Sequence, residues 1–112
     1  MAFLPEENFF EESLATNYDL SLGTLNFASS DISAFSTISL QFSYNTVSGP
    51  NLFTVQQSND LIFWSDLGVE QEIPVGEGNF IIDKGIFSGK YVRVSFESVD
   101  TGVLSIILIA KR

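Results

Sequence analysis

The chain of 112 residues has no cysteine and no histidine. Without cysteine it has no disulfide bond and no thiolate metal ligand. Without histidine it has no Ser-His or Cys-His nucleophile pair, no imidazole ligand and no near-neutral general base. We therefore expect no catalytic residues, no metal site and no cofactor, and a protein that is not an enzyme.

Positive charge is scarce and unevenly placed. The chain has 5 Lys and Arg residues against 14 Asp and Glu residues, for a net charge of −9. All the basic residues lie at or after Lys84, where only Glu97 and Asp100 oppose them. An acidic body repels phosphates, so we expect no nucleic-acid partner. The uneven charge has two possible roles. It serves solubility alone, or it makes the surface self-complementary, so that the basic C-terminal strands of one copy meet an acidic face of another.

Long apolar runs are missing as well. Residues 103–110 form an apolar run, but it is far shorter than the roughly 20 residues that span a bilayer. The first residues lack the basic start and the long apolar run of a secretory signal. We expect a protein made in the cytoplasm, with no membrane partner.

Alternating apolar and polar residues dominate what is present. Hydrophobic residues make up 45% of the chain and aromatic residues 13%, which is enough to form a core. Residues 38–44 alternate strictly, as in a half-buried strand, and no stretch has a helical period. The pattern predicts an all-β chain: a single antiparallel β-sandwich or jelly roll of about eight short strands. We assign residues 15–112 to this domain and residues 1–14 to an N-terminal arm.

Within the sandwich, the turn signals predict one tight hairpin. Asn59 and Asp60 tolerate a left-handed backbone, so residues 52–58 and 61–67 are expected to pair as its two strands. The glycine-containing residues 76–79 are expected to form a loop before a short strand at 80–83.

Both ends of the chain hold more apolar surface than one small domain needs. The arm interleaves phenylalanine with acidic pairs, and it packs either on its own domain or on a neighbouring subunit. The last strand, residues 103–110, is apolar on both faces, which is typical of a strand covered on both sides. We favour a covering partner. The predicted interface residues are Phe3, Leu4, Phe9, Phe10, Arg93, Leu104, Ile106, Leu108 and Arg112.

Two further sets of side chains allow more than one interpretation. Trp64, Tyr91 and Tyr44 could form a platform on which a sugar stacks, but we expect Trp64 to fill the core of the sandwich instead. The acidic residues of segment 66–83 could bind calcium, but they lack the spacing of a calcium loop, so we expect solvated loop carboxylates.

Two family resemblances rest on the same segments. Residues 55–60 followed by 63–67 resemble the hairpin of discoidin (coagulation factor 5/8 C-type, galactose-binding-like) domains, and residues 89–94 are similar to their later strand; Leu61 stands where that turn usually has glycine. In overall layout, with residues 100–103 turning into a terminal apolar strand, the chain is similar to small all-β virion proteins of bacteriophages.

The phage resemblance implies a non-enzymatic structural protein of a phage particle, either a capsid decoration protein or a tail- or fibre-associated one. Such a protein is made in the host cytoplasm, is located in the virion and contacts itself or other virion proteins. The alternative, from the discoidin resemblance and the aromatic residues, is a carbohydrate-binding β-sandwich module with a glycan as partner.

Overall fold

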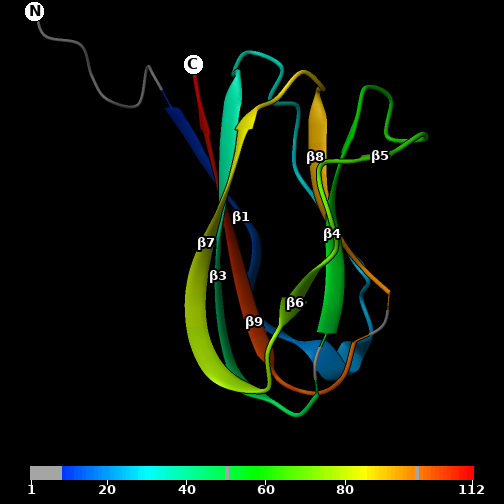
Figure 1. The fold of residues 1–112 in the computed structure, drawn as a ribbon, viewed down its shortest axis with the longest axis vertical. Helices are drawn as coiled ribbons and strands as arrows, with labels where there is room; N and C mark the ends of the chain where they lie inside the picture. Colours follow the sequence, from blue (N-terminus) through cyan, green and yellow to red (C-terminus); the bar gives the residue numbers. More distant parts are fainter. Residues whose placement is uncertain (1–8, 50, 98) are drawn as a thin grey trace, which may run out of the picture.

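The computed structural model describes residues 9–49, 51–97 and 99–112. They form antiparallel strands joined by loops and one short 3-10 turn, which confirms the all-β prediction (Figure 1). The elements are β1 (Phe9–Asp19), η2 (Leu20–Leu22), β2 (Asn26–Ala28), β3 (Thr37–Val47), β4 (Asn51–Ser58), β5 (Ser65–Asp66), β6 (Gln71–Ile73), β7 (Gly76–Ile86), β8 (Tyr91–Phe96) and β9 (Val103–Lys111).

The strands form two facing sheets, seen edge-on in Figure 1. One sheet has the order β1-β9-β3-β7, and the other has the order β2-β8-β4-β5, with β6 also paired to β4. From β1 to β4 the chain passes from one sheet to the other at every step, so none of these four strands pairs with the next one in the sequence. This is the arrangement of a jelly-roll sandwich.

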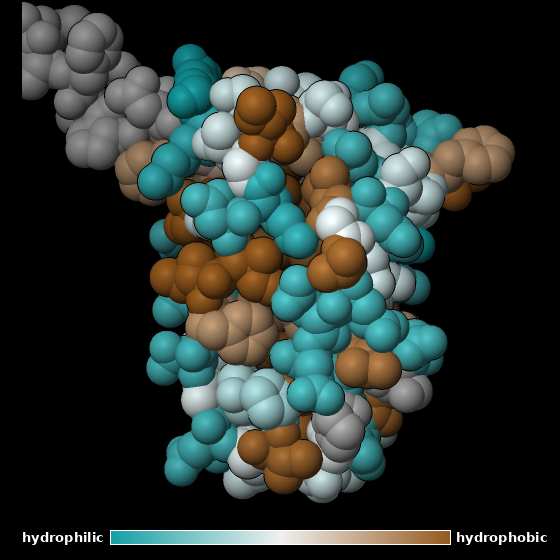
Figure 2. All heavy atoms as spheres, viewed as in Figure 1, coloured by the Kyte–Doolittle hydropathy of each residue, from teal (hydrophilic) through white to brown (hydrophobic). Residues whose placement is uncertain are grey.

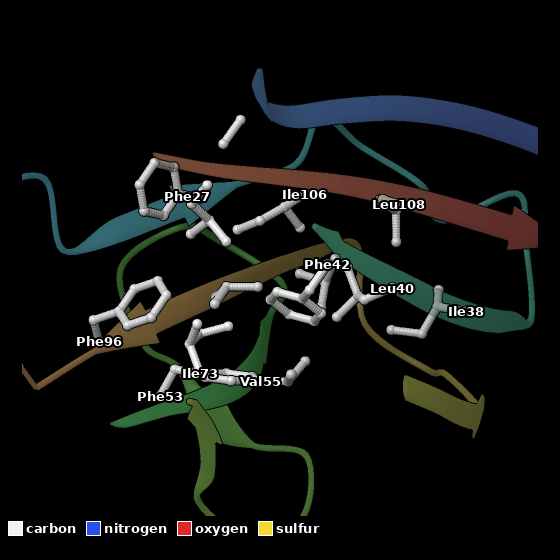
Figure 3. Close-up of a cluster of buried hydrophobic side chains, with 14 of the residues drawn as sticks. Phe27, Ile38, Leu40, Phe42, Phe53, Val55, Ile73, Phe96, Ile106 and Leu108 are labelled. Atoms are coloured by element: carbon white, nitrogen blue, oxygen red, sulfur yellow. The ribbon is translucent and has the colours of Figure 1, made fainter. Parts of the chain in front are cut away.

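The core lies between the two sheets and is built by the alternation seen in the sequence. From Ile38 to Tyr44 every second residue of β3 points inward, and Ile38, Leu40 and Phe42 are fully buried or nearly so. The ring centroid of Phe42 lies 4.9 Å from those of both Phe53 and Phe80. Figure 3 shows the side chains of the two sheets meeting in this layer. Removing this apolar surface from water is the main stabilising contribution to the fold.

Strand β9 turns toward the core the same face that was predicted to form an interface. Leu104, Ile106 and Leu108 are fully buried between the sheets, so the prediction that they form a contact surface is wrong. Figure 3 shows Ile106 and Leu108 in this position. The outward side chains include Ile107 and Ile109, which are half-buried between those of β1 and β3. Whether a partner covers this outer face stays a prediction.

The N-terminal segment enters the sheet earlier than expected. Strand β1 begins at Phe9 and pairs with the end of β9, with Phe9 opposite Lys111. Residues 9–14 are therefore part of the sandwich, and the predicted arm of residues 1–14 is wrong over that stretch. Phe3 and Leu4 lie outside the described residues.

Two loops were also placed wrongly. The predicted pairing of residues 52–58 with 61–67 is confirmed only where Gln56 and Gln57 pair with β5, which is two residues long; residues 59–64 form a loop instead of a tight turn. In contrast, β7 spans the predicted loop 76–79 and continues to Ile86, beyond the predicted strand 80–83. It does so with a β-bulge, because Ile38 pairs with Gly85 while Ser39 pairs with Asp83, and Gly85 accommodates the bulge with a φ of 63°.

Candidate functional site

The loop between β4 and β5 carries three consecutive exposed apolar side chains. Leu61, Ile62 and Phe63 are 50%, 73% and 78% exposed. We call these three residues the knuckle. The loop projects from the edge of the sandwich near β5 in Figure 1, and the corresponding projection in Figure 2 is hydrophobic at its tip. Single exposed apolar residues are common, but three in a row are unusual and make this loop the candidate contact surface.

Polar groups beneath the knuckle fix its backbone. The Ser58 hydroxyl accepts hydrogen bonds from the backbone N–H groups of Asp60 (3.1 Å) and Leu61 (2.9 Å). It donates to the Asp60 carboxylate at 3.0 Å. That carboxylate in turn accepts from the N–H groups of Ile62 and Phe63, both at 2.9 Å. These bonds, with that from Phe63 the strongest influence, lower the pKa of Asp60 and keep it ionised.

The backbone of the knuckle is strained at one residue. Leu61 has a φ of 67°, a left-handed conformation that is unfavourable for a residue with a branched side chain. Its carbonyl accepts a hydrogen bond from the Trp64 indole at 3.3 Å. Strain of this kind persists where surrounding contacts enforce it, and it is most common at functional sites.

Trp64 lies at the base of the knuckle, outside the core, so its predicted position in the core is wrong. It is half-buried, and the guanidinium carbon of Arg93 lies 4.3 Å from the centroid of its ring. Arg93 donates to the Gln56 amide oxygen at 2.8 Å, and the Gln56 amide donates to Asp66 at 2.8 Å. Partial burial lowers the pKa of Arg93. This chain of contacts ties β4, β5 and β8 together beneath the loop.

The aromatic platform, which was the alternative to a buried Trp64, is not assembled. Tyr91 begins β8 in the same sheet as the knuckle, but Tyr44 is in β3 of the other sheet. There Tyr44 packs against the core, with its ring edge-to-face to Phe80 at 6.1 Å. The three aromatic residues therefore do not share one face.

A polar pocket lies beside the knuckle. It has a volume of about 280 Å³, and the Phe63 side chain forms part of its wall. The amide oxygen of Gln57 is buried beside it without a hydrogen-bond partner. The lining residues are Gln57, Ser58, Asn59, Asp60, Phe63, Ser65, Ser88 and Gly89. Amide and hydroxyl groups of this kind can bind a hydroxyl-rich ligand.

A second hollow, of about 210 Å³, lies on the other sheet where β7 bulges. We call it the bulge hollow. No atom lies within 4 Å of the position that a side chain on Gly85 would take, so the space above that residue is open. Ile86, beyond the bulge, is 85% exposed. The lining residues are Thr37, Ile38, Ser39, Asp83, Gly85, Ile109 and Lys111.

The structure brings together only part of the predicted interface. The Phe10 ring stacks on Phe35 at 5.9 Å, and the guanidinium carbon of Arg112 lies 5.6 Å from the centroid of the same ring. Phe9 is next to this cluster, opposite Lys111. Arg93 belongs to the other sheet. The sequence reasoning missed the knuckle, because its apolar run was interpreted as a buried strand.

The described part of the chain shows neither a cluster of metal ligands nor a membrane-spanning helix. Over residues 9–49, 51–97 and 99–112, no three acidic side chains gather in a group that could hold a metal ion. The same residues include no helix long and apolar enough to cross a membrane.

Comparisons with protein-family models and with curated protein sequences find no match. Solved structures share the fold. The prophage-derived protein YomS of SPBc2 aligns over 93% of this chain and 95% of its own, at 14% identity and a TM-score of 0.54. The disulfide-linked pili that form Bacillus endospore appendages contain a chain that aligns over 93% of this one and 88% of its own, at 11% identity and a TM-score of 0.53.

The K3 cleaved adhesin domain of Lys-gingipain from Porphyromonas gingivalis aligns over 75% of this chain, at 13% identity and a TM-score of 0.55. This chain covers 62% of the length of that domain. At these identities the likeness extends to the fold alone. Phage-derived, pilus and adhesin proteins thus share this β-sandwich. The fold alone does not distinguish among functions.

Proposed function

We propose that this chain is a non-enzymatic structural protein of a phage particle, a capsid decoration or tail- or fibre-associated component that acts through protein–protein contacts. The observation that carries the proposal is the knuckle. A large aromatic side chain next to branched aliphatic ones, presented on a fixed backbone, is the composition of an interface anchor. Because the backbone is already ordered, binding costs little conformational entropy.

The fold supports the same proposal. Jelly-roll sandwiches are common in viral capsids, and the prophage-derived protein matches this chain over almost the whole length of both. The disulfide linkage of the pili is not available to this chain, because it has no cysteine. Non-covalent burial of apolar side chains is the means of association left to it.

Particle incorporation tests the proposal. Particles are purified on density gradients from cells that make the virus and the full chain, carrying either the natural sequence, Ile62→Ser or Leu22→Ser. Leu22 is 72% exposed on η2, at the other end of the molecule, so Leu22→Ser removes a comparable apolar side chain elsewhere. We expect the natural chain and Leu22→Ser in the particles in a fixed copy number, and Ile62→Ser at reduced occupancy. Particles without the natural chain would refute the virion assignment.

A carbohydrate-binding function is the second candidate, and the observation that favours it is the polar pocket beside the knuckle. The Ser65 and Ser88 hydroxyls and the Gln57 amide can exchange hydrogen bonds with sugar hydroxyls, while Phe63 offers an aromatic wall. Titration with D-galactose, D-glucose and N-acetylglucosamine, followed by backbone amide shifts, tests it. Saturable shifts at the pocket residues that disappear in Ser88→Trp support a sugar site. Unchanged spectra with all three sugars count against it.

A further inference from the structure

We infer that the knuckle of one copy inserts into the bulge hollow of a second copy, so that the protein assembles head to tail. This inference rests on the proposed function, because it names the partner of the knuckle. It is carried by two features on opposite sheets: an exposed apolar projection, and an open hollow whose mainly polar lining includes the outward side chain of Ile109.

The sizes of the two features match. An enclosed cavity of about 150 Å³ can hold a benzene-sized ring. The bulge hollow, at about 210 Å³, has room for one large side chain such as that of Phe63 or Ile62. Ile109 lies in its wall and the exposed Ile86 stands beyond it, so an inserted ring would meet apolar groups.

The charges around the two features are complementary. Asp60 and Asp66 flank the knuckle on either side. Lys111 lines the hollow, and Arg112 follows it at the exposed end of β9. Asp83 is the one acidic residue in the lining of the hollow. The pairing therefore places the acidic loop of one copy against the basic C-terminal strand of the next, which favours encounter at low salt.

The two surfaces are different parts of the molecule, so the contact is heterologous. Each copy that uses its knuckle still offers its hollow, and each copy that fills its hollow still offers its knuckle. Such a contact continues either until a ring closes or as an open chain. A symmetric contact of knuckle against knuckle would instead stop at a dimer.

Two variants separate the two halves of the contact. Phe63→Ser removes the largest knuckle side chain and leaves the hollow. Ser39→Phe places the chain's own phenyl ring at the hollow, on the outward face of β3, and leaves the knuckle. Lys111→Glu is a second hollow variant that changes charge rather than shape, for use if Ser39→Phe does not fold. Leu22→Ser is the control, since Leu22 lies away from both features.

Sedimentation velocity and light scattering over a concentration series measure the assembly of the full chain. We expect the natural chain and Leu22→Ser to grow beyond a dimer with concentration. Each knuckle or hollow variant alone should associate about 10-fold more weakly or worse. An equimolar mixture of Phe63→Ser and Ser39→Phe should form a one-to-one dimer and nothing larger, because one intact knuckle meets one intact hollow.

Three results would overturn the inference. These are a natural chain that stays monomeric up to about 1 mM, hollow variants that associate as well as the natural chain, and a mixture of the two variants that does not pair. If any of these holds while Ile62→Ser still loses its place in particles, the knuckle binds a different virion protein. The proposed function then stands and the head-to-tail contact falls.

Discussion

The core and the knuckle of this protein are arranged in opposite ways. Between the sheets, apolar side chains such as Phe42 point inward, and polar ones point toward water. At the β4–β5 loop a polar side chain is inside: the Ser58 hydroxyl is part of a residue only 4% exposed, and it organises the loop together with the exposed Asp60 carboxylate. There the apolar side chains of Ile62 and Phe63 point outward.

This inversion means that different interactions stabilise the core and the β4–β5 loop. Apolar burial holds the sandwich together, so loss of a core side chain should cost stability. Directional hydrogen bonds hold the loop, so its apolar side chains contribute little to folding and are free to contact a partner. If the proposed contact is correct, folding and contact are carried by separate residues, and each can be disturbed alone.

The largest effect is expected in the core. Phe42→Ala removes a fully buried ring that stacks on Phe80 and packs against Phe53. The free energy of unfolding should fall by about 3–5 kcal/mol, because transfer and cavity costs add. Urea denaturation followed by fluorescence measures it. Phe63→Ser, the matched change in the knuckle, should stay within about 0.5 kcal/mol of the natural chain; similar losses in the two variants would contradict the comparison.

A smaller effect is expected at the support of the loop. Ser58→Ala leaves the N–H groups of Asp60 and Leu61 without their acceptor. We expect a loss of about 1–3 kcal/mol of stability and a knuckle that is less ordered, seen as lower NMR order parameters for the backbone amides of residues 60–63. The Phe42→Ala variant should keep an ordered knuckle at temperatures where it is folded. Unchanged order parameters in Ser58→Ala would show that other contacts fix the loop.

The sheets could be predicted because each buries one face. Over residues 38–44 the alternation of large apolar and small polar side chains leaves one possible orientation, and the structure has it. In residues 103–110 both faces are apolar, so periodicity could not tell which one enters the core. The neighbouring strands decide it, since they place Leu104, Ile106 and Leu108 opposite the second sheet.

The knuckle could not be predicted from hydrophobicity, because its apolar side chains point toward water. A run of Leu, Ile, Phe and Trp is expected to be buried, and the sequence was therefore interpreted as a hairpin strand. The signal that could have located the loop is polar: Ser58 and Asp60 are spaced to accept hydrogen bonds from the next backbone N–H groups. The leucine at a position where the resembling turn usually has glycine was the second signal, and its φ of 67° explains why glycine suits that position.

Leu61→Gly should change the free energy of unfolding less than Ser58→Ala does, and it should weaken association between copies. Glycine relieves the left-handed strain, which is worth about 1–2 kcal/mol, but it also gives the unfolded chain more freedom, at a cost of about 0.4–1 kcal/mol. The net gain in stability should lie below about 1.5 kcal/mol. Association should weaken, because an apolar side chain of the knuckle is lost. Thermal unfolding and sedimentation of the same sample measure both; a variant that is less stable yet associates normally would contradict the assignment of strain to a contact function.

The smallest effect is expected from protonation of Asp60. Its pKa is lowered in the folded protein by hydrogen bonds from Phe63 and Ile62, so its ionised form favours the folded loop. The contribution is fully present above the unfolded value of about 3.9, and it is lost as the pH falls through the lower folded value. The knuckle should therefore stay ordered at pH 4 and loosen only in stronger acid, while the core remains packed. Amide shifts of residues 60–63 followed from pH 6 to pH 2 test this, with Asp60→Asn as the variant that should lack the transition. A midpoint at or above the ordinary carboxyl value would mean that the Asp60 carboxylate does not hold the loop.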